Sequence, residues 1–186
     1  QALVGPFIAV GREPGLAHKA TISTESAAAV AGGITSYMDM PNTIPNVTSR
    51  PVLMDKYRLA RGRSHANYSF YFGAANDNLD EIRALRPGDC CAVKMFMGSS
   101  TGNMLVDDPA TLERIFADCP MLIATHCEDT PMIKANEERF RQQYGEDVPF
   151  AAHPQIRSPE SAYKSTDLAV SLARRHGARL HVLHLS

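Results

Sequence analysis

The chain has 186 residues, of which 44% are hydrophobic, and a formal net charge of −1 at pH 7. It can bury a sizeable core, and its near-neutral charge provides no electrostatic attraction to nucleic acid or to anionic membranes. Because no apolar stretch approaches the roughly 20 residues that a membrane-spanning helix needs, we expect a cytoplasmic protein that binds a small-molecule substrate.

The cysteines indicate neither a disulfide framework nor a cysteine zinc finger, because they include no Cys-x-x-Cys pair. We expect reduced, mostly buried thiols at Cys90, Cys91, Cys119 and Cys127. The chain begins at Gln1 and ends at Ser186, directly after an apolar run, so we expect it to be part of a longer protein.

Strand-like and helix-like segments alternate along the chain. Apolar runs predict β-strands at residues 34–40, 68–73, 92–98, 121–126 and 180–186. Helices, several of which open with Ser, Thr, Asp or Pro, are predicted at residues 25–31, 51–61, 78–85, 109–117, 130–144 and 159–176. This alternation indicates βα units and a parallel sheet.

Four different strands or strand ends carry a polar residue, namely Asn42, Lys94, His126 and His184. Barrels build active sites from the C-terminal ends of several strands. A doubly wound sheet more often concentrates its signal in one glycine-rich turn, and neither G-x-G-x-x-G nor a Walker sequence is present. We therefore expect an α/β fold of the (β/α)₈ barrel type, which takes about 250 residues. We expect residues 1–186 to form one domain with roughly the first six βα units, lacking the C-terminal portion.

Lys94 lies in the apolar run of residues 90–98, where an ammonium group has no obvious route to water. One interpretation is that its long side chain reaches water at the strand end. The other is that burial lowers its pKa, because desolvation disfavours the charged form. A neutral amine can add carbon dioxide to form a carbamate. Such an anionic ligand can bridge two divalent metals about 3.5–4 Å apart.

His126 and His184 each follow an apolar run, and imidazole is the commonest neutral ligand of zinc. Either alone is better explained as a hydrogen-bonded structural residue, but their shared position with Lys94 at strand ends favours a metal site. His181 would point to the opposite strand face from His184, and we choose His184 because it ends the strand. The other histidines are expected in exposed loops or helix ends, at His18, His65, His153 and His176.

Asn42 follows an apolar strand, and Pro41 stiffens the turn that presents it. The asparagine either caps this turn or contacts a substrate. Arg12 precedes a Pro-Gly turn and offers a guanidinium group suited to bidentate binding of a carboxylate. A lone arginine at a turn is, however, usually a surface residue.

Motifs across nearly the whole chain resemble those of the cyclic amidohydrolases, and the dihydroorotases most closely. They are Arg-Glu-Pro-Gly at 12–15, Met-Pro-Asn-Thr at 40–43, Val-Lys-Met-Phe-Met-Gly at 93–98, Thr-His-Cys-Glu at 125–128 and His-Val-Leu-His-Leu-Ser at 181–186. The resemblance implies a metal-dependent barrel enzyme with two zinc ions. Its reaction would be the reversible ring closure of N-carbamoyl-L-aspartate to L-dihydroorotate in pyrimidine biosynthesis.

The resemblance also implies roles for single residues. Lys94 looks like the carboxylated lysine that bridges both metals, its carbamate derived from carbon dioxide. His126 and His184 look like ligands of the second metal. Arg12 and Asn42 look like the pair that binds the substrate's carboxylate. As partners we expect the small-molecule substrate and further copies of the chain in a homo-oligomer.

Two family features are missing from residues 1–186. No His-x-His sequence precedes Arg12, and the metal-binding aspartate that acts as general acid and base is expected beyond Ser186. We therefore assign no catalytic residue, and expect the chain alone to be inactive. One alternative is an allantoinase or hydantoinase, although allantoinases tend to have Asn in place of Arg12. The other is a catalytically silent barrel that acts as a regulatory or partner-binding subunit.

Overall fold

The computed structural model describes residues 13–15, 17, 18, 20–98 and 103–184. Its strands are β1 (Ser36–Asp39), β2 (Asn67–Phe70), β3 (Phe72–Gly73), β4 (Val93–Phe96), β5 (Ile123–His126) and β6 (Leu180–Val182). Each predicted strand is thus confirmed within the described residues. The predicted run 68–73 is divided at Tyr71, although the Tyr71 N–H still donates to the Asp39 carbonyl at 2.9 Å.

The predicted helices are also confirmed. They are α1 (Ile22–Ala31), α2 (Arg50–Ala60), α3 (Leu79–Arg83), α4 (Pro109–Asp118), α5 (Thr130–Tyr144) and α7 (Pro159–His176). Asp108, Asp129 and Ser158 cap α4, α5 and α7 by accepting a hydrogen bond from a backbone N–H of the first turn, and each is followed by an early proline. Two short elements were not predicted, η1 (Phe150–Ala152) and α6 (His153–Ile156).

The strands pair in parallel and in chain order. β1 pairs with β2, and β3 to β6 form a second group in the order β3-β4-β5-β6. The Cys91 N–H donates to the Phe70 carbonyl at 3.0 Å, which links the two groups. A doubly wound sheet reverses its strand order at a switch point, and no reversal occurs among the described strands. The fold is therefore parallel α/β, with the sequential order found in the wall of a barrel.

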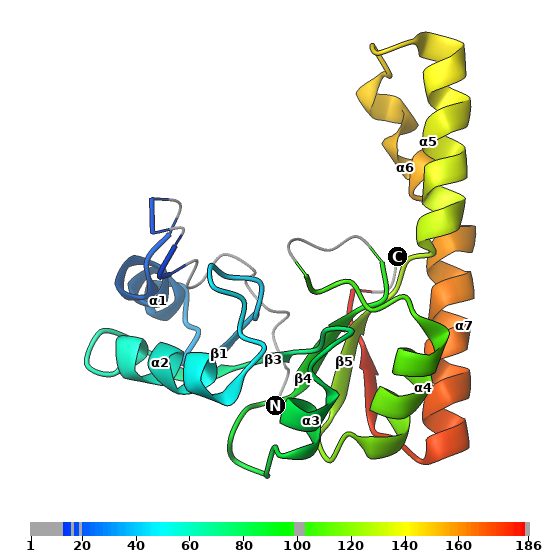
Figure 1. Ribbon diagram of the computed structural model, residues 1–186. Coiled ribbons are helices and arrows are strands. Elements are labelled where there is room, and N and C mark those ends of the chain that lie inside the picture. The colour runs from blue at the N-terminus through cyan, green and yellow to red at the C-terminus, as the bar shows by residue number, and fades with distance from the viewer. Residues whose placement is uncertain (1–12, 16, 19, 99–102, 185–186) are drawn as a thin grey trace.

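Helices cover one face of this sheet. The main hydrophobic core joins outward side chains such as Val93 and Ile123 to residues of α2, α4 and α7, and Figure 1 shows α4 and α7 on the same side of the strands. On the opposite face, a smaller cluster contains only residues of strands or their ends, Met40, Tyr71, Ala92, Ala124 and Leu183. Because side chains alternate along a strand, Lys94 faces this inner side.

One part of the chain extends beyond the sheet. The end of α5, with η1 and α6, projects past the carboxyl ends of the strands (Figure 1).

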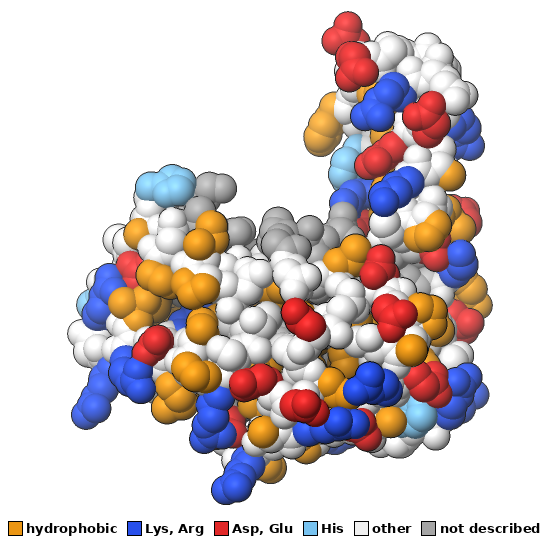
Figure 2. Space-filling model, viewed as in Figure 1, with side chains coloured by type: hydrophobic (Ala, Val, Ile, Leu, Met, Phe, Trp, Pro, Cys, Tyr) orange, Lys and Arg blue, Asp and Glu red, His pale blue; other side chains and the backbone are white. Residues whose placement is uncertain are grey.

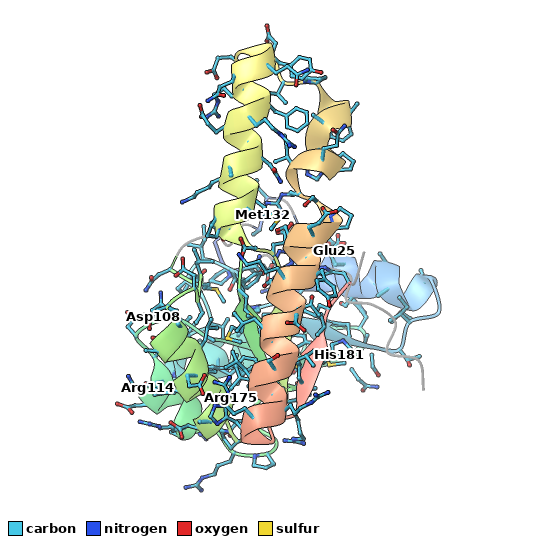
Figure 3. All side chains as sticks on the ribbon, turned by 90° about the vertical axis from the view of Figure 1, so that its right-hand side faces the viewer. Glu25, Asp108, Arg114, Met132, Arg175 and His181 are labelled. Atoms are coloured by element: carbon cyan, nitrogen blue, oxygen red, sulfur yellow. The ribbon has the colours of Figure 1, made fainter. Side chains whose placement is uncertain are left out.

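Acidic and basic side chains are intermixed on the face in Figure 2, in keeping with the net charge of −1. Near the end of α7, Arg175 pairs with Glu113 of α4 at 2.9 Å (Figure 3). None of the helices in the described part has the length and apolar character needed to cross a membrane.

Candidate metal centre

Lys94 is buried on the inner face of β4, where its side chain is 2% exposed. Its Nζ donates to the Met95 carbonyl at 3.1 Å and lies 3.7 Å from the centroid of the Phe96 ring. Burial lowers the pKa of Lys94 to about 7, although Cys127 opposes the shift. The interpretation that this lysine reaches water is therefore wrong, and a large share of the amine is neutral near pH 7.

His126 and His184 meet at the carboxyl ends of the strands beside Lys94. His126 lies opposite Phe96 in the register of β4 and β5. Its Nδ1 is 3.0 Å from His184 Nε2, and the two ring centroids are 4.8 Å apart. The structure therefore brings together the two histidines that were selected from the sequence. His181, which was not selected, is exposed and lies opposite Ala124.

Glu128 orients the His126 ring. Its Oε2 is 2.6 Å from His126 Nε2, and Arg157 Nη1 donates to both carboxylate oxygens at 2.9 and 2.7 Å. Since an ionised carboxylate only accepts hydrogen bonds, Nε2 carries the hydrogen and Nδ1 directs its lone pair at His184. A carboxylate behind the ring is also what fixes the tautomer of metal-binding histidines.

The backbone at His184 is strained. Its φ is 35°, and no other non-glycine residue in the described part of the chain has a positive φ. This left-handed conformation is uncommon outside glycine, and such strain clusters at functional sites. Because β6 ends at Val182, the two-residue alternation of a strand no longer applies at His184. The turn instead brings its ring against His126.

The residues fit a zinc ion. A Zn–N distance of about 2.0–2.1 Å in a tetrahedral site separates two ligand nitrogens by roughly 3.3 Å, close to the 3.0 Å between His126 and His184. Desolvation lowers the pKa of His126, which favours the neutral form that binds metal, while Glu128 opposes this shift. No group of three or more His, Cys, Asp or Glu side chains suited to a metal occurs in the described residues. The histidine pair thus needs a modified Lys94, or residues outside the described part, to complete a site.

The two residues expected to bind the substrate lie apart from this group. Asn42 follows β1, which is separated from β4 by other strands in the sheet order, and it is half-buried. Arg12 lies outside the described residues. Its motif nevertheless reaches the residue directly after the Asn42 motif, because the Gly15 N–H donates to the Ile44 carbonyl at 2.9 Å. A Cβ at Gly15 would come within 2.5 Å of Ile44 Cβ, so this close approach requires glycine.

Sequence reasoning missed several residues around the site. Glu128 was noted only as part of a motif, and its spacing of two residues from His126 was the available signal. Arg157 carried no signal because it is 29 residues from Glu128 in the chain. One expectation was wrong: His176 is half-buried rather than exposed, and its Nε2 is 2.8 Å from a Glu113 oxygen. The expected exposure of His18, His65 and His153 is confirmed.

Replacing Glu128 with Gln should lower the zinc affinity of the complete protein by about 10–100-fold, the usual cost of losing a carboxylate behind a ligating histidine. The matched control is Glu113→Gln, since Glu113 also bridges a histidine and an arginine, at 2.8 and 2.9 Å, but lies on α4 away from the strand ends. Affinity is measured by competition with a zinc chelator. Equal affinities in the two variants would refute the orienting role of Glu128.

Known proteins resemble this chain over most of its length. No family model matches it. It is 34% identical to the dihydroorotase of Methanosarcina acetivorans over 94% of this chain and 37% of that protein. It is 32% identical to the allantoinase of Streptomyces avermitilis over 94% of this chain and 39% of that protein. The solved structure of the L-hydantoinase from Arthrobacter aurescens matches with a TM-score of 0.78 and 30% identity, over 89% of this chain and 37% of that one.

A parallel α/β sheet that gathers polar side chains at the carboxyl ends of its strands has the arrangement of an α/β enzyme. The dihydroorotase, allantoinase and hydantoinase relatives indicate the cyclic amidohydrolase family for this chain. The family predicted from the sequence motifs is thereby confirmed. The chain spans less than two fifths of the length of these three relatives.

Proposed function

We propose that the protein carrying this chain is a zinc-dependent dihydroorotase with a (β/α)₈ barrel. It would close N-carbamoyl-L-aspartate reversibly to L-dihydroorotate in the cytoplasm, during de novo pyrimidine biosynthesis. The observation that carries the proposal is the buried Lys94, its pKa lowered to about 7, beside the paired His126 and His184. The dihydroorotase relatives, one of them 34% identical, support the same reaction.

In this proposal Lys94, His126 and His184 would hold metal. The neutral Lys94 amine would attack carbon dioxide: a nitrogen–carbon bond forms, one carbon–oxygen π bond opens, and the nitrogen releases one proton to solvent, so that the neutral amine becomes a carbamate anion. When bound, zinc supplies a Lewis acid and lowers the pKa of a coordinated water to about 7. Glu128 keeps the His126 hydrogen on Nε2, which leaves Nδ1 free to bind. The inner-face cluster around Ala92 and Ala124 would exclude water from one side of the site.

The carboxylate of the substrate would be bound by Arg12 and Asn42. The Asn42 side chain forms no hydrogen bond with any residue that the structure describes, so its amide is available as a donor. The hydrogen bond between Gly15 and Ile44 supports a shared role for the two motifs, because it joins the first motif to the residue directly after the second at 2.9 Å. A guanidinium and an amide together offer several donors to one carboxylate.

A second candidate is hydrolysis of a hydantoin or allantoin ring. The likeness to the L-hydantoinase structure, at a TM-score of 0.78, and to the allantoinase, at 32% identity, favours it. Arg12 argues against it, because the allantoin ring carries no matching carboxylate. The reaction with dihydroorotate therefore remains our first proposal.

The test is to purify the complete protein, measure its zinc content, and compare its rates on dihydroorotate, hydantoin and allantoin. We expect two zinc ions per chain and a kcat/KM for dihydroorotate at least about 100-fold above the other rings, or about 2.7 kcal/mol of discrimination. Two zinc ions without turnover of dihydroorotate would overturn the assignment. A folded protein that gains no activity with zinc and bicarbonate would instead indicate a silent barrel.

A further inference from the structure

A buried ion pair lies beside the turn that follows β1. Lys56 of α2 and Asp39 of β1 are each 3% exposed, and Lys56 Nζ is 2.7 Å from Asp39 Oδ2. Burial lowers the pKa of Lys56, while the Asp39 carboxylate opposes that shift. Apolar side chains of similar volume often stabilise a core as well as a buried ion pair does, or better. The pair therefore calls for an explanation other than stability.

Both partners bind the backbone of Met40, the residue that leads into the turn. Asp39 Oδ1 accepts a hydrogen bond from the Met40 N–H at 3.0 Å, and Lys56 Nζ donates to the Met40 carbonyl at 2.9 Å. That carbonyl belongs to the peptide group that joins Met40 to Pro41, whose ring fixes its own φ. The ion pair thus sets the plane of the peptide from which the Asn42 turn starts.

The rest of the turn is held by its own backbone. The Pro41 carbonyl accepts hydrogen bonds from the N–H groups of Thr43 and Val47, each at 2.9 Å. The Val47 carbonyl in turn accepts from the Gly73 N–H at 2.7 Å, which fastens the turn to β3. Asn42 lies at the centre of this frame, and its side chain has no hydrogen-bond partner in the described residues. A rigid backbone therefore presents an available amide.

We infer that Asp39 and Lys56 are positioning residues, whose buried ion pair holds Asn42 in the orientation that binds the substrate's carboxylate. The inference rests on the proposed function, in which Asn42 contacts the substrate. An apolar pair at the two positions would fill the same volume, but it would release the Met40 carbonyl and N–H. Only polar partners hold both groups, which accounts for polar side chains at a site where charge brings little stability.

The test is the double variant Asp39→Asn with Lys56→Met in the complete protein. It leaves no isolated buried charge, whereas Asp39→Asn alone would deprive Lys56 of its counter-ion. We expect KM for dihydroorotate to rise about 10-fold, with kcat reduced less than about 3-fold and zinc content unchanged, because only binding of the carboxylate is impaired. Amide hydrogen exchange at Thr43 and Val47 should become at least about 10-fold faster.

Tyr57→Phe is the matched control. Tyr57 is the next residue of α2, and its hydroxyl is 3.1 Å from Ser69 Oγ, so it also joins α2 to the sheet, without a hydrogen bond from its side chain to the described residues of the turn. This variant should keep wild-type KM and exchange. Wild-type KM and exchange in the double variant would overturn the inference, as would lower stability and kcat with unchanged KM. If the wild type does not turn over dihydroorotate, the proposed function fails, and exchange at Thr43 and Val47 still decides the positioning role.

Discussion

Replacing Lys94 with Ala is expected to lower kcat/KM for dihydroorotate by at least about 1,000-fold, equivalent to about 4 kcal/mol. The variant cannot form the anionic ligand proposed to lie between two metals, so their mutual repulsion would be uncompensated. Zinc content should fall together with activity. The control is Lys134→Ala, because Lys134 is exposed on α5 and should be dispensable. Wild-type turnover in the Lys94 variant would exclude the proposed bridge.

Carbamate formation gives Lys94 a specific dependence on pH. Only the neutral amine adds carbon dioxide, and burial lowers the pKa of Lys94 from 10.5 to about 7. In ¹³C-bicarbonate, a carbamate signal absent from the Lys94→Ala variant should therefore grow as the pH rises through about 7. The metal-free protein should also gain stability between about pH 7 and about pH 10.5, since the unfolded chain binds more protons there. A signal that does not change across pH 7 would contradict the lowered pKa.

Replacing Lys56 alone with Met is expected to destabilise the complete protein by about 3–5 kcal/mol, because the Asp39 carboxylate loses its partner while it stays buried. The double variant with Asp39→Asn should recover most of this loss, since both charges are then removed. The free energy of unfolding is measured in urea for the wild type and both variants. Equal stability of the wild type and the single variant would show that the two charges do not depend on each other.

Most of the fold could be predicted from local patterns. A strand covered on both sides leaves a continuous apolar run, as at residues 121–124, and a capping residue before proline marks a helix start, as at Asp108 and Asp129. The four residues of α6 escaped prediction because so short a segment shows no helical period. That the strands pair in chain order was learned only from the structure, because strand pairing joins segments far apart in the sequence.

The candidate site also contains some residues that could be selected from the sequence and others that could not. Lys94, His126 and His184 could be selected because each polar group interrupts or ends an apolar strand. The positioning pairs could not, since Glu128 with Arg157 and Asp39 with Lys56 join separate elements of the chain. The sequence did carry a signal that Lys56 is buried, because it shares a helix face with Leu53 and Ala60 at spacings of three and four residues. Without the neighbouring strand, that signal does not reveal which side chain pairs with the Lys56 ammonium group.

The amino-acid sequence by itself thus determined the family, the order of strands and helices, and the residues proposed to bind metal, because these depend on residue type and local period. Only the tertiary structure decided that Lys94 is cut off from water, that His126 presents Nδ1 to His184, and that a buried ion pair holds the Asn42 turn. These properties depend on burial and on distances between side chains from different elements, which no local pattern encodes.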